Sequence, residues 1–185
     1  HPILTEEQAM AEADRCLYCN DLCNICVTVC PNLANVAVMI DPIEIKIPEI
    51  NDSFIAEQKN QIINIGDFCN ECGNCTTFCP TSGDPYKTKP RFYLSEKAFN
   101  NEDNCYLLKE NSLLYKSNGD IKTLTLENSN FKYSSGLTTA EFDNQDYSVI
   151  KYDSKTTKNG NKELAKAVEM IFLFENLKEN SIFKY

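Results

Sequence analysis

The spacing of apolar residues predicts one helix near each end of the chain. Near the N-terminus, Thr5 and Gln8 form a capping box, which predicts a helix over residues 3–18. The apolar positions of this helix recur at helical spacing, at Ala9, Ala13 and Leu17. Near the C-terminus, Asn161 is predicted to cap a final helix. The residues that line one face of that helix are Leu164, Val168, Ile171 and Phe172.

Between the two helices, short apolar runs bounded by Pro, Gly and Asn predict β-strands. These runs lie at residues 36–40, 43–47, 61–65, 113–115, 121–126 and 147–152. Asn118 and Gly119 separate two of the runs, and this pair is typical of a type I′ β-hairpin. Residues 80–91 contain several prolines and a glycine, so this stretch is predicted to be a loop.

The character of the sequence changes near residue 105, and this change predicts two parts. Residues 1–104 carry nearly all of the cysteines, and residues 105–185 are predicted to form a small α+β extension for packing or docking. The chain has 185 residues, of which 42% are hydrophobic, so it can bury a modest core.

The charge and the cysteine usage exclude several functional classes. The net charge of −9 argues against nucleic acid as a partner, because phosphate binding needs clustered Lys and Arg. No apolar run approaches the roughly 20 residues of a membrane span, and no signal peptide is visible. Nine of the ten cysteines lie in two short stretches, whereas secreted disulfide scaffolds spread theirs more evenly. We therefore expect a protein of the reducing cytoplasm.

The two cysteine stretches have the spacing of iron–sulfur ligands. The second stretch follows the bacterial ferredoxin pattern C-x2-C-x2-C-x3-C-P. Its members are Cys69, Cys72, Cys75 and Cys79. The first stretch ends in the same way and carries five cysteines, which are Cys16, Cys19, Cys23, Cys26 and Cys30. Three thiolates at this spacing can surround one face of a cluster while the fourth reaches a neighbouring cluster, so the sequence predicts two [4Fe–4S] clusters.

An internal repeat assigns the ligands to the two clusters. Cys26 and Cys30 lie 49 residues before Cys75 and Cys79. With ligand exchange between the halves, one cluster takes Cys30, Cys69, Cys72 and Cys75. The other takes Cys79 and three cysteines from the first stretch, for which there are four candidates: Cys16, Cys19, Cys23 and Cys26. The repeat favours the last three and leaves Cys16 spare.

Other readings of the cysteines are less favoured. A zinc ribbon needs two Cys-x2-Cys pairs and lacks the Cys-Pro ending. Disulfides rarely join neighbours only three or four residues apart in a loop. Cys105 stands alone and is predicted to be a packing residue. Lys87, Lys89 and Arg91 are predicted to form a solvated basic loop.

The remaining sequence shows no catalytic apparatus. It contains no dinucleotide fingerprint, no phosphate-binding loop and no plausible histidine base. We therefore expect no substrate-converting site in this chain, and any substrate chemistry is expected to lie elsewhere.

Two segments carry a resemblance to known families. Residues 12–19, Glu-Ala-Asp-Arg-Cys-Leu-Tyr-Cys, resemble the start of the iron–sulfur domains in glutamate synthase small subunits and dihydropyrimidine dehydrogenases. This resemblance implies that Cys16 and Cys19 are ligands, which leaves Cys23 as the spare cysteine. Residues 26–36 and 67–80 resemble the C-terminal part of the bacterial family named "putative selenate reductase subunit".

Members of that family are longer flavin-dependent oxidoreductases. The resemblance implies that an upstream part binds FAD and NAD(P)H, and that this chain is the C-terminal electron relay. A start at His1 rather than Met agrees with a fragment of a longer protein. The expected partners are a flavin-containing domain or subunit and a redox partner protein.

Together these observations predict an α+β fold. It comprises a two-[4Fe–4S] bacterial-ferredoxin-like domain with an N-terminal helix, and the small α+β C-terminal extension. The predicted function is electron transfer through both clusters. The alternatives are a free-standing soluble ferredoxin and a structural metal module that only organises partner binding.

Overall fold

The computed structural model describes residues 4–17, 23–47, 52–57, 59–155 and 160–184, with the backbone only at 12–17, 52, 160 and 161. Its helices are α1 (Glu6–Leu17), α3 (Ile25–Thr28), α4 (Asn74–Thr77), α5 (Pro85–Thr88), α6 (Glu96–Asn101) and α7 (Gly160–Leu177), with 3-10 turns η2 (Gly66–Phe68) and η3 (Ser181–Phe183). Its strands are β1 (Asn35–Met39), β2 (Ile43–Ile47), β3 (Asp52–Ala56), β4 (Asn60–Ile65), β5 (Arg91–Tyr93), β6 (Cys105–Lys109), β7 (Ser112–Ser117), β8 (Asp120–Glu127), β9 (Asn130–Ser134), β10 (Thr138–Asp143) and β11 (Val149–Ser154).

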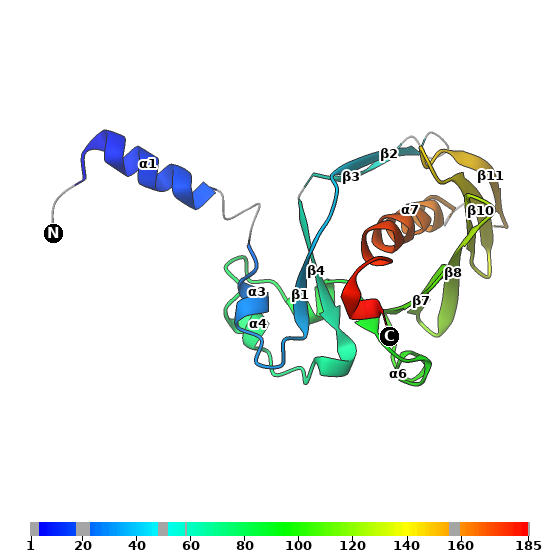
Figure 1. Cartoon of the computed structure of the whole chain (residues 1–185), viewed down its shortest axis with the longest axis horizontal. Coiled ribbons are helices and arrows are strands. Elements are labelled where there is room, and N and C mark those ends of the chain that lie inside the picture. The colour runs from blue at the N-terminus through cyan, green and yellow to red at the C-terminus, as the bar shows by residue number, and fades with distance from the viewer. Residues whose placement is uncertain (1–3, 18–22, 48–51, 58, 156–159, 185) are drawn as a thin grey trace.

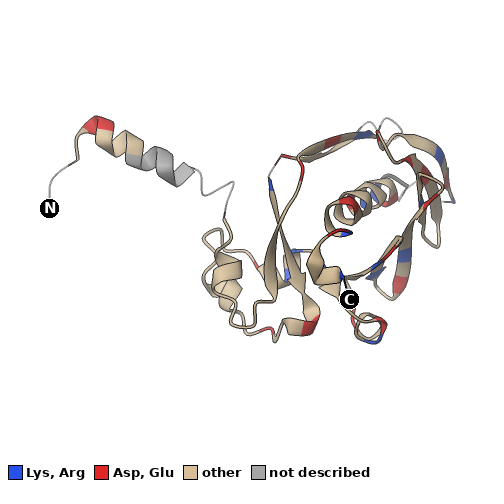
Figure 2. Ribbon diagram, in the orientation of Figure 1, with Lys and Arg blue, Asp and Glu red and all other residues tan. Residues whose placement is uncertain are grey.

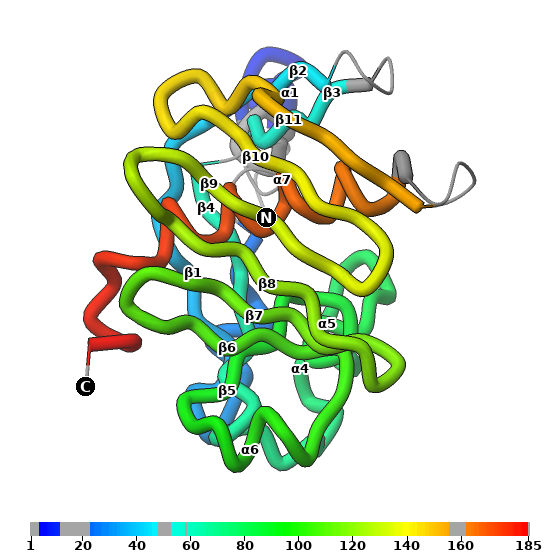
Figure 3. The backbone as a smooth tube through the Cα atoms, turned by 90° about the vertical axis from the view of Figure 1, so that its right-hand side faces the viewer, coloured from blue at the N-terminus to red at the C-terminus, as the bar shows by residue number. Residues whose placement is uncertain are grey.

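One large mixed sheet organises the described chain. Its nine strands follow the order β1-β4-β5-β6-β7-β8-β9-β10-β11, and β2 and β3 form a separate two-stranded sheet. Only the pairs β4–β5 and β5–β6 are parallel, and the other neighbours are antiparallel. Figure 3 shows β5 to β11 following one another across the face of the molecule.

The C-terminal helix α7 lies inside the curve of this sheet (Figure 1). Its buried side chains are Leu164, Ala167, Val168, Met170, Ile171, Phe172, Leu173, Phe174 and Leu177. Burial on nearly all sides is expected only for a helix that other elements enclose. The β2–β3 hairpin covers a further side, where the rings of Phe54 and Phe172 lie 5.3 Å apart between centroids. The same core continues to Ile63 and Phe92, in strands next to the cysteine segments.

The predicted fold class, a small two-cluster ferredoxin-like domain with a small extension, is wrong. Strands β6 to β11 and helix α7, all beyond residue 104, supply most of the large sheet and the helix that it encloses. The sheet also passes residue 104 without a break, because β5 pairs in parallel with β6. Cysteine spacing describes local loops and carries no information on the long-range strand pairing that builds this sheet.

Several local predictions are confirmed. Thr5 and Gln8 exchange the two hydrogen bonds of a capping box at the start of α1. Asn118 and Gly119 both have positive φ, at 53° and 80°, as a type I′ hairpin between β7 and β8 requires. The predicted cap at Asn161 is wrong, since α7 already includes Gly160. The predicted 80–91 loop contains the short helix α5 and the first residue of β5.

Candidate functional site

The two cysteine segments adopt the same local conformation at their offset in sequence. Helices α3 and α4 occupy matching positions, and each buries one cysteine, Cys26 or Cys75. After each helix one residue takes a left-handed conformation, Leu33 with φ of 55° and Ser82 with φ of 54°. The repeat seen in the sequence is therefore also a repeat of backbone geometry.

The last cysteine of each segment accepts a backbone hydrogen bond on its sulfur. The N–H groups of Ala34 and Gly83 donate to Cys30 Sγ and Cys79 Sγ, each at 3.2 Å. The Thr81 hydroxyl lies 3.4 Å from Cys79 Sγ. The Thr81 hydroxyl and the Gly83 N–H together hold the pKa of Cys79 below its usual value. They favour the thiolate, which is the form of cysteine that binds metals.

Four of the predicted ligands line one cavity. They are Cys30, Cys69, Cys72 and Cys75, the set that the sequence assigns to one cluster. Asn35, Glu71 and Tyr86 line the same cavity. Its volume is about 10 Å³, which is room for about one water molecule. A larger group would therefore require the thiol side chains to turn outward.

The two segments meet through their buried cysteines. Cys26 and Cys75 pack together with Ile62 of β4 in a small apolar cluster. Burial raises the pKa of the Cys26 thiol, while the positive charge of Lys89 acts in the opposite direction. The charge of Lys89 also acts on Cys79. Lys89 therefore lies close to two cysteines that the sequence assigns to the other cluster.

The remaining predicted ligands are only partly within the described structure. Cys16 lies in α1, where only the backbone is described, and Cys19 lies outside the described residues. Cys23 is exposed, and all of the described cysteines are free thiols. In the part of the chain that the structure describes, no three Cys, His, Asp or Glu side chains come close enough to hold one metal ion. The choice among the candidate ligands of the first stretch stays open.

Cys105 lies apart from this region and is fully buried. It packs with Tyr93, Phe99 and Leu107, as expected for a packing residue. Burial raises the pKa of its thiol to about 11. At neutral pH it is therefore a small apolar side chain rather than a potential ligand.

A buried polar row beside the cavity is not predicted from the sequence. Asn35 Nδ2 donates to the Cys26 carbonyl at 3.0 Å, and Asn64 Nδ2 donates to Asn35 Oδ1 at 2.9 Å. In the sheet, Asn35 pairs with Asn64, and Asn64 pairs with Arg91. Asn35 begins an otherwise apolar strand, and Asn64 interrupts the apolar end of β4 between Ile63 and Ile65. These polar positions are the signal that could have revealed the row.

Arg91 departs from the prediction of a solvated basic loop. Its side chain is only 17% exposed, and its Nη1 donates to Glu71 Oε1 at 2.8 Å. Lys87 fits the prediction better, because it is exposed and lies 3.4 Å from Asp84 at the surface. Arg91 thus connects strand β5 to a residue that lines the cysteine cavity.

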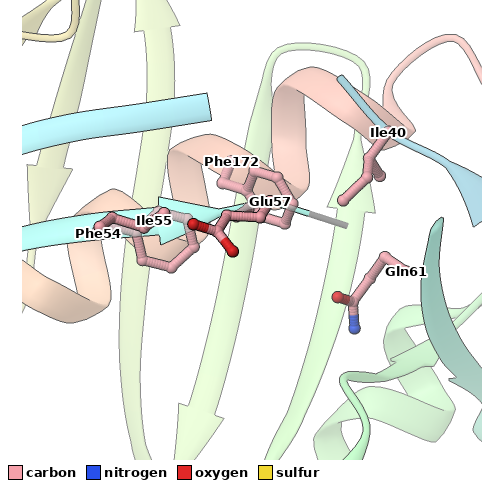
Figure 4. A pocket seen from close by; sticks show the side chains of 7 residues that line it. Ile40, Phe54, Ile55, Glu57, Gln61 and Phe172 are labelled. Atoms are coloured by element: carbon pink, nitrogen blue, oxygen red, sulfur yellow. The ribbon is translucent and has the colours of Figure 1, made fainter. Parts of the chain in front are cut away.

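A second cavity offers no comparable chemistry. It has a volume of about 510 Å³ and lies between β3, α7 and the start of β4 (Figure 4). Most of its lining is apolar, from Ile40, Phe54, Ile55, Ala56 and Phe172. Among the described residues that line it, Glu57 and Gln61 are polar, and none is Cys, His, Lys or Arg.

Charged side chains are scattered over the sheet, whereas α3 and α4 carry none (Figure 2). The charged residues beside the cysteines lie outside these two helices, at Glu71, Asp84 and Lys87. None of the described helices has both the length and the apolar character needed to cross a membrane.

Part of this chain is similar in sequence to a protein that is named as an oxidoreductase. Over 99 residues it is 41% identical to "Putative oxidoreductase YgfK" of Escherichia coli K12, and equally to the protein of that name from Escherichia coli O157:H7. The match covers 54% of this chain and 8% of each relative, so the chain spans a small part of their length. No family model and no solved structure matches.

The expected relationship to oxidoreductases is therefore confirmed as sequence similarity over these 99 residues. The relative's name is consistent with a redox role for this chain. The attribution to a selenate reductase subunit stays a prediction, and so do the cluster ligands and the cytoplasmic location.

Proposed function

We propose that this chain transfers electrons through two [4Fe–4S] clusters, as part of a larger flavin-dependent oxidoreductase. The observation that carries the proposal is the single cavity lined by Cys30, Cys69, Cys72 and Cys75. These residues come from segments far apart in the sequence. Four cysteine thiolates are the usual ligands of a [4Fe–4S] cluster, so the donor set has the right chemistry.

The surroundings of the sulfurs also fit. Backbone N–H groups donate to the sulfurs of Cys30 and Cys79, and such bonds stabilise thiolates and tune a bound cluster. When bound, the clusters supply one-electron redox chemistry. The protein's own residues hold the sulfurs, limit the access of water and set the local field.

The spacing of the cysteines favours a cluster over a single metal ion. The second stretch follows the Cys-x2-Cys-x2-Cys-x3-Cys-Pro pattern of [4Fe–4S] ligands, whereas a zinc ribbon lacks the Cys-Pro ending. The cavity of about 10 Å³ is smaller than a cubane, so in this proposal the thiol side chains turn outward when a cluster binds.

The relationship to an oxidoreductase supports the larger context. In this proposal the chain works in the cytoplasm beside a flavin-containing domain or subunit. FAD and NAD(P)H bind to that other part, and a redox partner protein exchanges electrons with the clusters. The chain itself converts no substrate.

Anaerobic reconstitution with iron and sulfide tests the proposal. We expect about eight iron atoms and eight sulfides per chain, with visible absorption that dithionite bleaches. Cys30→Ala is expected to lose about half of the iron, because it removes one ligand of the cavity. Cys105→Ala is the matched control and is expected to retain all of it. A colourless protein that binds zinc and no sulfide would contradict the proposal.

A further inference from the structure

We propose that Arg91 raises the reduction potential of the cluster held by Cys30, Cys69, Cys72 and Cys75, and thereby makes the two clusters unequal. This inference rests on the proposed function. It adds a named residue that gives the two sites different roles in electron transfer.

The first argument is the position of the guanidinium. Arg91 begins β5, and its side chain is largely buried, with 17% exposed. It donates to Glu71, which lies between two of the cavity cysteines and itself lines the cavity. Cys69 lies close enough to this guanidinium to interact with it electrostatically. A permanent cation is therefore fixed beside one wall of the site.

The second argument is unused hydrogen-bonding capacity in the same place. Arg91 Nε is buried and has no hydrogen-bond partner within the described residues. Its neighbour in the sheet, Asn64, has an unpaired Oδ1 there as well. Asn64 reaches the cavity through Asn35, so the polar row and the ion pair border the same site. A buried cation with a spare N–H stabilises added negative charge nearby.

The electrostatic consequence has a definite sign. Reduction adds one negative charge to the site. A nearby cation favours the reduced form and so raises the potential, and the effect is stronger where burial limits screening by water. Glu71 offsets part of this field, but it is 54% exposed and therefore better screened than Arg91.

The sequence repeat does not extend to this ion pair. The residues 49 positions before Glu71 and Arg91 are Leu22 and Pro42, neither of which carries a charge. The cation near the other cysteines is Lys89, whose charge acts on Cys26 and Cys79. The ion pair is thus not repeated at the equivalent positions. We expect the cluster bound by Cys69 to be reduced before the other.

A redox titration of the reconstituted full chain, followed by EPR, tests the inference. Arg91→Gln is expected to shift one of the two reduction steps to lower potential and to leave the other in place. Lys89→Gln is the matched control, because it removes one positive charge two residues away on the side of Cys26 and Cys79. Because Cys26 packs against Cys75, this variant is expected to shift that step by less than Arg91→Gln does, and to shift the other step more. Cys72→Ser, which alters the cavity cluster, identifies that step.

A second variant keeps the test decisive if Arg91→Gln loses its cluster. Glu71→Gln removes an exposed charge from the same ion pair and is expected to shift the same step to higher potential. Two equal potentials in the intact chain, or an unmoved step in variants that retain full iron content, would overturn the inference and leave the proposed function standing. Absence of clusters from the intact chain would instead remove the proposed function itself.

Discussion

At the scale of single residues, the surroundings of two cysteines shift the pKa values of their thiols in opposite directions. Cys79 sits at a partly open turn, where the Thr81 hydroxyl and the Gly83 N–H lower the pKa of its thiol. Cys105 is fully buried in an apolar cluster, and burial raises the pKa of its thiol to about 11. Cys79 therefore ionises more readily than an ordinary cysteine, and Cys105 stays protonated at neutral pH.

Alkylation of cluster-free protein measures this difference. We expect iodoacetamide to modify Cys79 first, and at a lower pH than an ordinary cysteine. At pH 8, Cys105 should carry on the order of a hundredfold less thiolate than an ordinary cysteine, and so react slowly. Peptide mass spectrometry across a pH series gives both rates. Equal rates in the folded protein would contradict the prediction, whereas equal rates in urea are expected.

The raised pKa of Cys105 also predicts a pH dependence of stability. A folded-state pKa above the unfolded value means that its contribution is complete below about pH 8.5. That contribution is lost as the pH rises toward 11. In urea unfolding between about pH 8.5 and 11, the free energy of unfolding of the wild type should therefore fall more steeply with pH than that of Cys105→Ala, which lacks this thiol. Parallel pH dependences would contradict the prediction.

At the scale of elements, the 3-10 turn η2 fixes how the chain enters the second cysteine segment. Gly66 begins this turn, and an added Cβ would clash with the Tyr93 ring. That ring is buried, with 5% exposed, so moving it disturbs the side chains packed around it. The Arg91 guanidinium lies 5.6 Å from the ring centroid, so a displaced ring would also disturb the ion pair beside the cavity.

Gly66→Ala is therefore expected to cost about 1–3 kcal/mol of stability through overpacking. It should also reduce the iron retained after reconstitution. Gly136→Ala is the matched control, because an added Cβ there meets nothing within 4 Å. Its effect should stay within about 0.5 kcal/mol. Urea unfolding and iron analysis of both variants check the prediction, and equal effects would argue against it.

The elements that the sequence predicts best are those defined by neighbouring residues. The capping box at Thr5 and the hairpin at Asn118 depend on contacts within a few positions. Strands β9 and β10 are not predicted, because only Phe131 and Tyr133 in one, and Ala140 and Phe142 in the other, mark their buried face.

The candidate site likewise has a part that local sequence predicts and a part that it does not. The repeated spacing predicts which four cysteines share the cavity. The approach of Arg91 and Asn64 depends on pairing between β4 and β5, and no local pattern specifies it.

At the scale of the whole molecule, one core spans the predicted boundary at residue 104. Ile45, Ile63 and Phe92 on one side of that boundary belong to the same buried cluster as Leu113 and Phe174 on the other. The division into residues 1–104 and 105–185 stays a prediction. Its physical test is whether the first part can bury its apolar residues without the second.

We expect that residues 1–104 expressed alone do not unfold cooperatively, since the strands and helix that cover Ile63 and Phe92 are missing. The full chain should instead show one cooperative transition by calorimetry, because a shared core couples its parts. Residues 23–185 provide the control, since they retain every described strand together with α7. This shorter chain should keep the single transition. A sharp transition in the 1–104 fragment would mean that this part folds independently, and that the shared core joins two autonomous units.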